Sequence, residues 1–420
     1  MKNSGIEWIE GLPETWQEIP NRYLFIDHSV KVGEQWKDYQ LLSLTTSGVK
    51  EKNVNTGGGK VPDSYENYQT VEIGDMIFCL FDLDCSAVFS GLSNYNGMIT
   101  SAYNVFMPNS KYLNNLYVDY WFQYVFSNRY YKMYSKNIRY TVTTEMFKSI
   151  LTPIPPLDEQ RKIGEFLLEK DKQIAELIAN QQVQIEKLKE YKQSVITEAV
   201  TKGLDKSAPM KDSGIEWIGE IPAHWDIIAT KSLFDVIAGA TPDSSNPLNW
   251  DGEIRWITPA DYKTEDIYVE FGRRNLSKIG FNSCSTSLIP AGNIIFSKRA
   301  PIGAVVINNT ELCTNQGCLS CVNKGLANIK FYYYTMSIAT EQYELLGSGT
   351  TFKEISCNTF SNFRLPYPSL EMQQQIADYL DEKCGKIDRL IAIKQEKIEK
   401  LQEYKKSLIY EYVTGKKEVV

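Results

Sequence analysis

Histidine is scarce in this sequence, because only His28 and His224 occur among the 420 residues. This scarcity disfavours histidine-rich metal sites and most Ser-His-Asp or Cys-His catalytic machinery. The eight cysteines are too sparse for a disulfide framework, which indicates reduced thiols. Cys318 and Cys321 have the CxxC spacing of a zinc site, with Cys313 nearby, but a second ligand pair is missing. The run GCLSCV also alternates like a buried strand, so we expect no metal site.

Long apolar runs and targeting signals are missing too. The opening MKNSGIEWIEGLPETW contains no basic flank, no apolar core and no small-residue cleavage site, so we expect no signal peptide. No apolar run reaches the length of about 18 residues that a membrane-spanning helix needs. The sequence therefore predicts a cytoplasmic protein without a membrane partner.

Catalytic motifs are the third class of missing feature. The sequence has no GxGxxG after a strand, and Gly57–Lys60 lacks the spacing of a phosphate-binding P-loop. Asn246-Pro247-Leu248 does not fit the methyltransferase pattern that ends in an aromatic residue. Asp82 and Asp84 have no convergent partners for acid–base or metal chemistry. We therefore predict a non-catalytic chain that binds no cofactor of its own.

The charge balance disfavours a chain that wraps nucleic acid by bulk charge, because 45 basic and 52 acidic residues give a net charge of −7. Residues 1–155 carry 13 basic and 16 acidic side chains, and residues 206–364 carry 14 and 16. Any nucleic-acid contact must therefore be a local face of an acidic surface. Hydrophobic residues, at 43%, are sufficient for packed cores.

What the sequence does contain is an internal duplication. Residues 2–16, KNSGIEWIEGLPETW, match residues 211–225, KDSGIEWIGEIPAHW, at nine of 15 positions. Residues 153–201 match residues 366–414 at 25 of 49 positions, without a gap and at an offset of 213. The intervening parts diverge. Each half is therefore a variable globular part followed by a shared segment.

The shared segment has the pattern of a long helix. Residues 158–200 contain no proline, whereas Pro153, Pro155 and Pro156 lie just before them. Apolar residues recur at gaps of three, four or seven, as a packed helix requires, and such a helix spans roughly 65 Å. We expect the two helices to pair antiparallel, although each could instead dock only on its own domain. The candidate positions for helix pairing or partner docking are Ile174, Leu177, Ile178, Ile185, Leu188, Tyr191, Val195, Ile387, Leu390, Ile391, Ile398, Leu401, Tyr404 and Leu408.

The fold class that follows is α+β, with two α+β domains separated by a coiled-coil spacer of two long antiparallel helices. The predicted boundaries are 1–155 and 206–365 for the domains, and 156–205 and 366–420 for the helices. Strand-like stretches occur at 39–45, 75–81, 254–258, 293–297 and 304–307, and helical stretches at 112–127 and 326–345. The duplication predicts pseudo-two-fold symmetry.

Basic, amide and aromatic residues cluster in the variable parts, and such residues supply phosphate contacts and base-edge hydrogen bonds. For any one of them a solvated surface is the simpler interpretation. The candidates for DNA binding are Lys60, Arg129, Lys132, Lys136, Arg139, Tyr140, Arg273, Arg274, Lys278, Lys298, Arg299, Thr350, Thr351 and Lys353.

This layout resembles the specificity subunits of type I restriction-modification enzymes. The resemblance covers the whole chain and rests on SGIEWI-x-x-x-P-x-x-W, which opens both halves, and on P-x-P-x-L-x-x-Q, which precedes both helices at 153–160 and 366–373. The stretch GSGTTFKEI at 347–355 is also similar to that family. The first half has NIRYTVTTEM at 137–146 in its place.

The resemblance implies a non-catalytic subunit with two target-recognition domains, each reading half of a bipartite double-stranded DNA site. The helices would set the half-site spacing and dock two modification subunits, which carry adenine-N6 methyltransferase chemistry with S-adenosylmethionine. Motor-nuclease restriction subunits would add cleavage with ATP and Mg, in a bacterial or archaeal phage defence. The alternatives are a helical scaffold that binds proteins without reading DNA, and an enzyme that acts alone.

Overall fold

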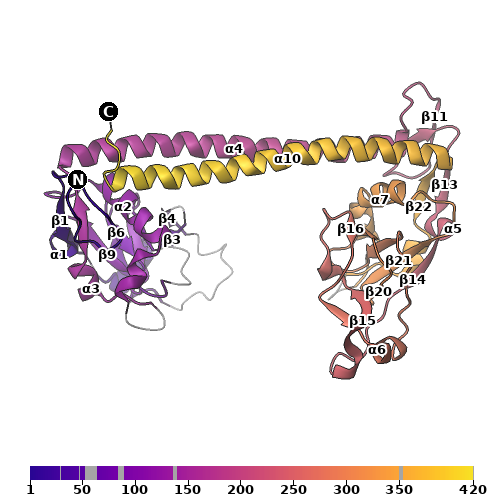
Figure 1. Cartoon of the computed structure of the whole chain (residues 1–420), viewed down its shortest axis with the longest axis horizontal. Coiled ribbons are helices and arrows are strands. Elements are labelled where there is room, and N and C mark those ends of the chain that lie inside the picture. Colours follow the sequence, from indigo (N-terminus) through magenta and orange to yellow (C-terminus); the bar gives the residue numbers. More distant parts are fainter. Residues whose placement is uncertain are drawn as a thin grey trace. The chain divides into compact units, whose positions relative to one another are not determined.

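The computed structural model describes residues 1–28, 30–46, 48–52, 64–83, 89–135, 140–349 and 353–419 (Figure 1). The chain divides into two compact units. The first comprises Met1–Gln182 with Gln395–Val420, and the second comprises Val183–Lys394. Both long helices, α4 (Leu157–Lys202) and α10 (Leu370–Val413), contribute to each unit. Within the described ranges, no helix is both long and apolar enough to cross a membrane.

The first unit holds an antiparallel sheet with strand order β2–β9–β6–β7, and the smaller pairs β3–β4 and β5–β8. A further pair, β1–β10, lies just before α4. The strands are β1 (Gln17–Pro20), β2 (Phe25–Asp27), β3 (Leu42–Thr45), β4 (Gly48–Glu51), β5 (Gln69–Val71), β6 (Met76–Phe78), β7 (Ser90–Leu92), β8 (Gly97–Ile99), β9 (Asn104–Pro108) and β10 (Leu151–Ile154). The helices are α1 (Asn21–Leu24), α2 (Asn115–Ser127) and α3 (Thr144–Ser149), with 3-10 turns η1 (Gly33–Asp38) and η2 (Tyr130–Tyr134).

The second unit holds a five-stranded sheet, β14–β21–β18–β19–β16, and a three-stranded sheet, β17–β15–β20. The pairs β11–β12 and β13–β22 complete its strands. The strands are β11 (Met210–Asp212), β12 (Glu220–Pro222), β13 (Asp226–Ala229), β14 (Phe234–Ala238), β15 (Trp250–Ile257), β16 (Tyr268–Val269), β17 (Arg274–Leu276), β18 (Ile294–Ser297), β19 (Val305–Asn308), β20 (Cys313–Thr314), β21 (Cys318–Asn323) and β22 (Arg364–Tyr367). The helices are α5 (Thr230–Leu233), α6 (Lys278–Asn282), α7 (Ile329–Ser337), α8 (Thr340–Leu346) and α9 (Cys357–Ser361), with η3 (Pro247–Asn249) and η4 (Pro259–Asp261).

Aromatic rings fill the core of each unit. In the first unit, Phe78 packs against Phe122 and Phe147, with ring centroids 4.8 Å apart in both cases. In the second, Phe296 lies 4.8 Å from Tyr343 and 4.2 Å from Phe360. Aromatic side chains bury large apolar areas, so these clusters provide much of the stability of each domain.

The start of each long helix is fixed by a buried glutamine, the last residue of the P-x-P-x-L-x-x-Q motif. Gln160 accepts a hydrogen bond from the backbone N–H of Asn114 at 2.8 Å and donates to the carbonyls of Tyr112 and Pro155. Gln373 likewise accepts from the N–H of Asn328 at 2.7 Å. Asn114 and Asn328 are the N-caps of α2 and α7. The motif therefore joins the first turn of each long helix to a domain helix.

The end of each long helix is fixed by a glycine that packs against a tryptophan of the opening motif. Gly203 follows α4 with φ +73°, and a Cβ at this position would lie 3.1 Å from Cζ2 of Trp225. Gly415 has φ +69°, and its Cβ would lie 3.2 Å from Cζ2 of Trp16. Glycine is required because this left-handed conformation and the close ring leave little room for a side chain.

The two long helices run antiparallel within each unit. In the first unit, Lys405 pairs with Asp171 at 2.5 Å, and the Phe166 and Tyr412 rings lie 4.6 Å apart. In the second, Lys192 pairs with Asp388 at 2.7 Å, and Lys394 hydrogen-bonds to Gln184. In both units, contacts later in the sequence of α4 are made to residues earlier in the sequence of α10. The predicted antiparallel pairing is thus confirmed (Figure 1).

The seam between the helices follows alternating gaps of four and three residues. The buried positions on α4 are Ile174, Gln181, Ile185 and Val195, and the half-buried ones are Ile178, Leu188 and Lys192. The duplicated positions on α10 are the buried Ile387, Ile398 and Leu408 and the half-buried Ile391, Lys394, Leu401 and Lys405. This spacing is the coiled-coil heptad. The polar members of the seam were not predicted from the apolar pattern.

Four predicted helix positions lie outside this seam. Leu177 and its duplicate Leu390 are 44% and 49% exposed, and Tyr191 and its duplicate Tyr404 are 57% and 53% exposed. At each of these two repeat positions, both copies of the helix therefore carry the same residue type, and both side chains are exposed. These four side chains therefore do not pack between the two helices.

The predicted strand and helix stretches largely coincide with elements of the structure. The exception is 326–345, which was expected as one helix and forms α7 and α8, with a break at Ile338–Ala339. The expected buried strand around GCLSCV is confirmed as β21. Burial raises the pKa of Cys313 to about 11 and that of Cys318 to about 12, so both thiols are protonated at neutral pH.

Candidate nucleic-acid interface

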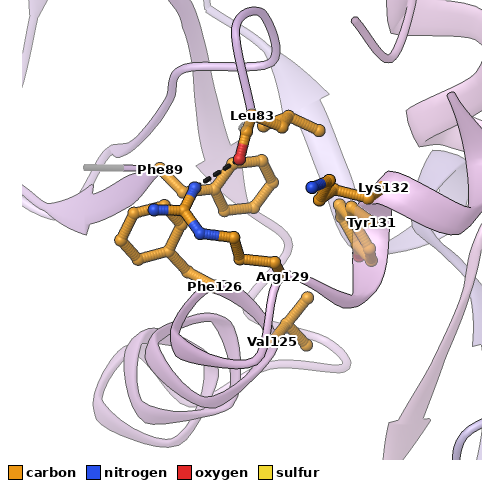
Figure 2. A pocket seen from close by; sticks show the side chains of 7 residues that line it. All are labelled: Leu83, Phe89, Val125, Phe126, Arg129, Tyr131 and Lys132. Atoms are coloured by element: carbon orange, nitrogen blue, oxygen red, sulfur yellow. Dashed lines mark hydrogen bonds between the residues drawn. The ribbon is translucent and has the colours of Figure 1, made fainter. Parts of the chain in front are cut away.

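Arg129 follows α2 and is held against the first domain. It adopts a left-handed backbone conformation with φ 53°, and its guanidinium donates a hydrogen bond to the carbonyl of Leu83. The guanidinium carbon also lies 5.6 Å from the centre of the Phe126 ring. Figure 2 shows this group beside a small apolar cavity of about 10 Å³, which has the size of a single water molecule. The cavity is therefore too small to hold a base or a cofactor.

Lys132 lies in the next turn, η2, and its Nζ is 4.2 Å from the centre of the Tyr140 ring. Tyr140 has φ 47°, and its carbonyl accepts a hydrogen bond from the N–H of Leu83. Arg129, Lys132 and Tyr140 are thus brought together around one loop. The predicted residues Lys60, Lys136 and Arg139 lie outside the described residues.

In the second domain, Lys298 and Arg299 share one carboxylate. Arg299 Nε lies 2.7 Å from Glu354 Oε2, and Lys298 Nζ lies 3.9 Å from Glu354 Oε1. The hydrogen bond from Arg299 holds the pKa of Glu354 below its usual value, so the carboxylate is charged at neutral pH. The charge of these two candidate DNA-binding residues is partly neutralised.

Backbone hydrogen bonds hold the Glu354 segment in place. Ser348 and Glu354 exchange N–H···O bonds of 2.9 Å, and the N–H of Ile355 donates to the carbonyl of Lys298 at 3.0 Å. Lys353 is exposed beside them. Thr350 and Thr351 lie outside the described residues. The GSGTTFKEI stretch therefore returns to the end of β18, where the two basic residues follow Ser297.

Three further candidates surround β17. The Nε of Arg273 lies 3.3 Å from Oδ1 of Asp261, whose side chain is 5% exposed, and the Arg273 side chain also donates to the carbonyl of Ala260. The guanidinium carbon of Arg274 lies 3.9 Å from the centre of the Trp250 ring. Lys278 is exposed as the first residue of α6. Arg273 is thus paired internally, whereas Arg274 is stacked on an aromatic ring.

Sequence inspection missed two residues that decide how these cations are held. Glu354 is 55 positions from Arg299, and Trp250 is 24 positions from Arg274, across an irregularity in the β15–β17 pairing between Trp250 and Ile254. No local pattern connects such residues.

His28 belongs to a cluster with two carboxylates in the first unit. His28 Nδ1 lies 2.9 Å from the buried carboxylate of Asp75, and this hydrogen bond raises the pKa of His28 above 6.5. Glu72 lies 3.7 Å from the other ring nitrogen. Among the residues that the structure describes, no group of three or more His, Cys, Asp or Glu side chains is placed to hold a metal ion.

The sequence matches a known family model over residues 90–187 and 222–403, which is more than half of the chain. That model is described as the type I restriction modification DNA specificity domain.

Two curated relatives carry related names, and both come from Methanocaldococcus jannaschii. The type I restriction enzyme MjaIX specificity subunit is 37% identical over 166 residues, covering 39% of this chain and 38% of that protein. The MjaVIII specificity subunit is 26% identical over 296 residues, covering 66% of this chain and 64% of that protein. The matches thus cover less than two thirds of the length of each relative.

Two solved structures share the fold. A chain from a study of complex assembly and conformational transition of the type I R-M system superposes with a TM-score of 0.74 and 17% identity, over 96% of this chain and 99% of that one. The crystal structure of the HsdS subunit from Thermoanaerobacter tengcongensis gives a TM-score of 0.53 with 16% identity, over 96% and 98%. The α+β fold class with long helices is confirmed.

Proposed function

Because the chain belongs to the type I restriction modification DNA specificity family, we propose that each of its two variable domains reads one half of a bipartite double-stranded DNA site. The observation that carries this proposal is the duplication of the framework around unlike surfaces. Gln160 and Gln373 anchor the helix starts in the same way, and Trp16 and Trp225 each pack on a glycine that follows a long helix. Residues 1–155 and 206–365 are the two recognition domains.

The helices at 156–205 and 366–420 set the spacing between the half-sites in this proposal. Their heptad seam supports a stiff pair of helices rather than two separate ones. A stiff connection is what a reader of two separated DNA segments needs, because DNA presents its half-sites at a fixed separation.

The same helices dock two modification subunits. The first unit exposes Leu177 with Tyr404, and the second exposes their duplicates Leu390 with Tyr191. Repeated apolar surfaces suit two copies of one partner, because identical partners require equivalent contacts. These partners supply adenine-N6 methyl transfer with S-adenosylmethionine. Motor-nuclease subunits supply the reactions that use ATP and Mg, and this chain contributes recognition alone.

DNA contact falls to the basic residues of the two domains. In the second domain these are Arg273, Arg274, Lys278, Lys298, Arg299 and Lys353, together with Thr350 and Thr351. In the first they are Lys60, Arg129, Lys132, Lys136 and Arg139, together with the aromatic Tyr140. Both domains are acidic overall, so the isolated chain binds DNA weakly and its partners supply most of the backbone contacts.

The test compares two sets of substitutions in the complex with its modification subunit. Replacing Arg274, Lys278, Lys298 and Arg299 with Ala should abolish sequence-specific methylation while the partner still co-purifies. Replacing Leu177 and Leu390 with Asp should release the partner. If the first set leaves methylation unchanged, the chain is a protein-binding scaffold without its own DNA readout.

A further inference from the structure

Arg274 lies over an aromatic ring at the edge of the three-stranded sheet. It begins β17, and its register partner on β15 is Trp256. Its guanidinium carbon lies 3.9 Å from the centre of the Trp250 ring, within the range of a strong cation–π contact. The side chain is exposed, although it covers an aromatic surface.

The platform under Arg274 is buried and packed on aromatic and apolar side chains. Trp250 and Trp256 are 5% and 7% exposed, and their rings meet edge to face with centroids 5.2 Å apart. The indole N–H of Trp256 donates to the carbonyl of Ala240 at 3.1 Å. Leu276 and Cys313 complete this small core. A guanidinium stacked on such a surface loses little entropy when it forms further hydrogen bonds.

Arg274 also differs from its basic neighbours in charge pairing. Arg273 pairs with Asp261, Arg255 lies 3.9 Å from Glu270, and Arg299 pairs with Glu354. Within the described part of the chain, no carboxylate lies within ion-pair distance of Arg274. Its N–H donors therefore remain available to an external acceptor, while the guanidinium rests on the Trp250 ring.

We propose that Arg274, stacked on Trp250, is a specificity-determining residue that reads a guanine in the half-site of the second domain. A planar guanidinium donates two parallel hydrogen bonds to O6 and N7 of guanine, and this is the commonest specific contact to a base in the major groove. The inference rests on the proposed function. It goes further by assigning one side chain to one kind of base.

The chemistry separates guanine reading from two simpler roles. A phosphate contact requires positive charge but no fixed plane, so lysine would replace arginine with little loss. A packing role requires the aliphatic stem over Trp250, so methionine would replace it. A guanine contact requires the fork itself, and neither lysine nor methionine supplies it.

The experiment profiles methylation by the complex with its modification subunit on a DNA library in which every position of the site is varied. Arg274→Lys and Arg274→Met are compared with the unmodified chain. The control is Arg364→Ala, which removes an exposed arginine on β22. Melting temperatures report whether the variants fold.

We expect both Arg274 variants to lose preference for guanine at one position by about 10- to 100-fold, with the other half-site and the spacing unchanged. The inference is overturned if the preference for guanine is unchanged. It is also overturned if Arg274→Met lowers methylation uniformly across sequences while Arg274→Lys retains it, or if neither variant folds. A bipartite site that both variants read normally refutes only this inference. An unmodified chain that directs no bipartite methylation refutes the proposed function instead.

Discussion

Lengthening both helices by one heptad should lengthen the gap between the half-sites. The perturbation inserts seven residues after Gln181 in α4 and seven after Lys394 in α10, which are duplicated seam positions. Seven residues preserve the alternation of four and three on which the seam depends, whereas four residues in one helix would rotate its seam away from the partner. At 1.5 Å per residue the helices grow by about 10.5 Å.

DNA rises about 3.4 Å per base pair, so the unspecified spacer in the target should grow by about three base pairs. Methylation profiling of the complex with its modification subunit measures the spacer directly. The matched control inserts the same seven residues at 206–208, between α4 and β11, and should leave the spacer unchanged. If the heptad variant folds, binds its partner and methylates sites with the original spacer, the helices do not set the spacing.

The remaining predictions concern stability and DNA affinity. Gly203→Ala should lower the stability of the second unit by more than Gly214→Ala. Both glycines have positive φ, which costs alanine about 1–2 kcal/mol, but only Gly203 faces Trp225. Equal shifts in melting temperature for the two variants would contradict a role of the Trp225 contact. Glu354→Gln should raise the affinity for unspecific DNA and steepen the slope of log affinity against log salt concentration by up to about 0.9 per freed cation. An unchanged slope in binding titrations would show that Glu354 does not compete with DNA phosphates for Lys298 and Arg299. His28→Gln should remove a stabilisation that is fully present below pH 6.5, the ordinary pKa of histidine, and that is lost as the pH rises through the raised pKa of the folded state. Melting temperatures are measured for the original chain and for this variant from acidic to alkaline pH. A constant difference between them would exclude a pH-dependent stabilisation by His28.

The helices could be predicted from the sequence because their signals are local. Proline positions mark the start of each helix, and the apolar period of three and four residues marks the seam. The sequence does not show which apolar residues enter the seam, because each of the two helices carries more apolar residues than the other helix covers. Leu177 and Tyr191 match the period as well as Ile174 and Ile185, yet only the latter pair is buried.

The sequence predicts which basic residues could form the candidate interface, but not which side chains they contact. Basic residues are visible in the sequence, whereas their partners come from distant segments. Glu354 neutralises part of the charge of Lys298 and Arg299, and the Trp250 ring lies under the guanidinium of Arg274. These contacts depend on sheet register and on the return of the chain to the end of β18, which no local pattern specifies.

The most direct test of the central claim is a genome-wide methylation map from cells that express this chain with its modification subunit. Two domains that each read a half-site predict one methylated sequence made of two specified segments separated by an unspecified spacer of constant length. A continuous recognition sequence, or methylation independent of sequence, would contradict the claim.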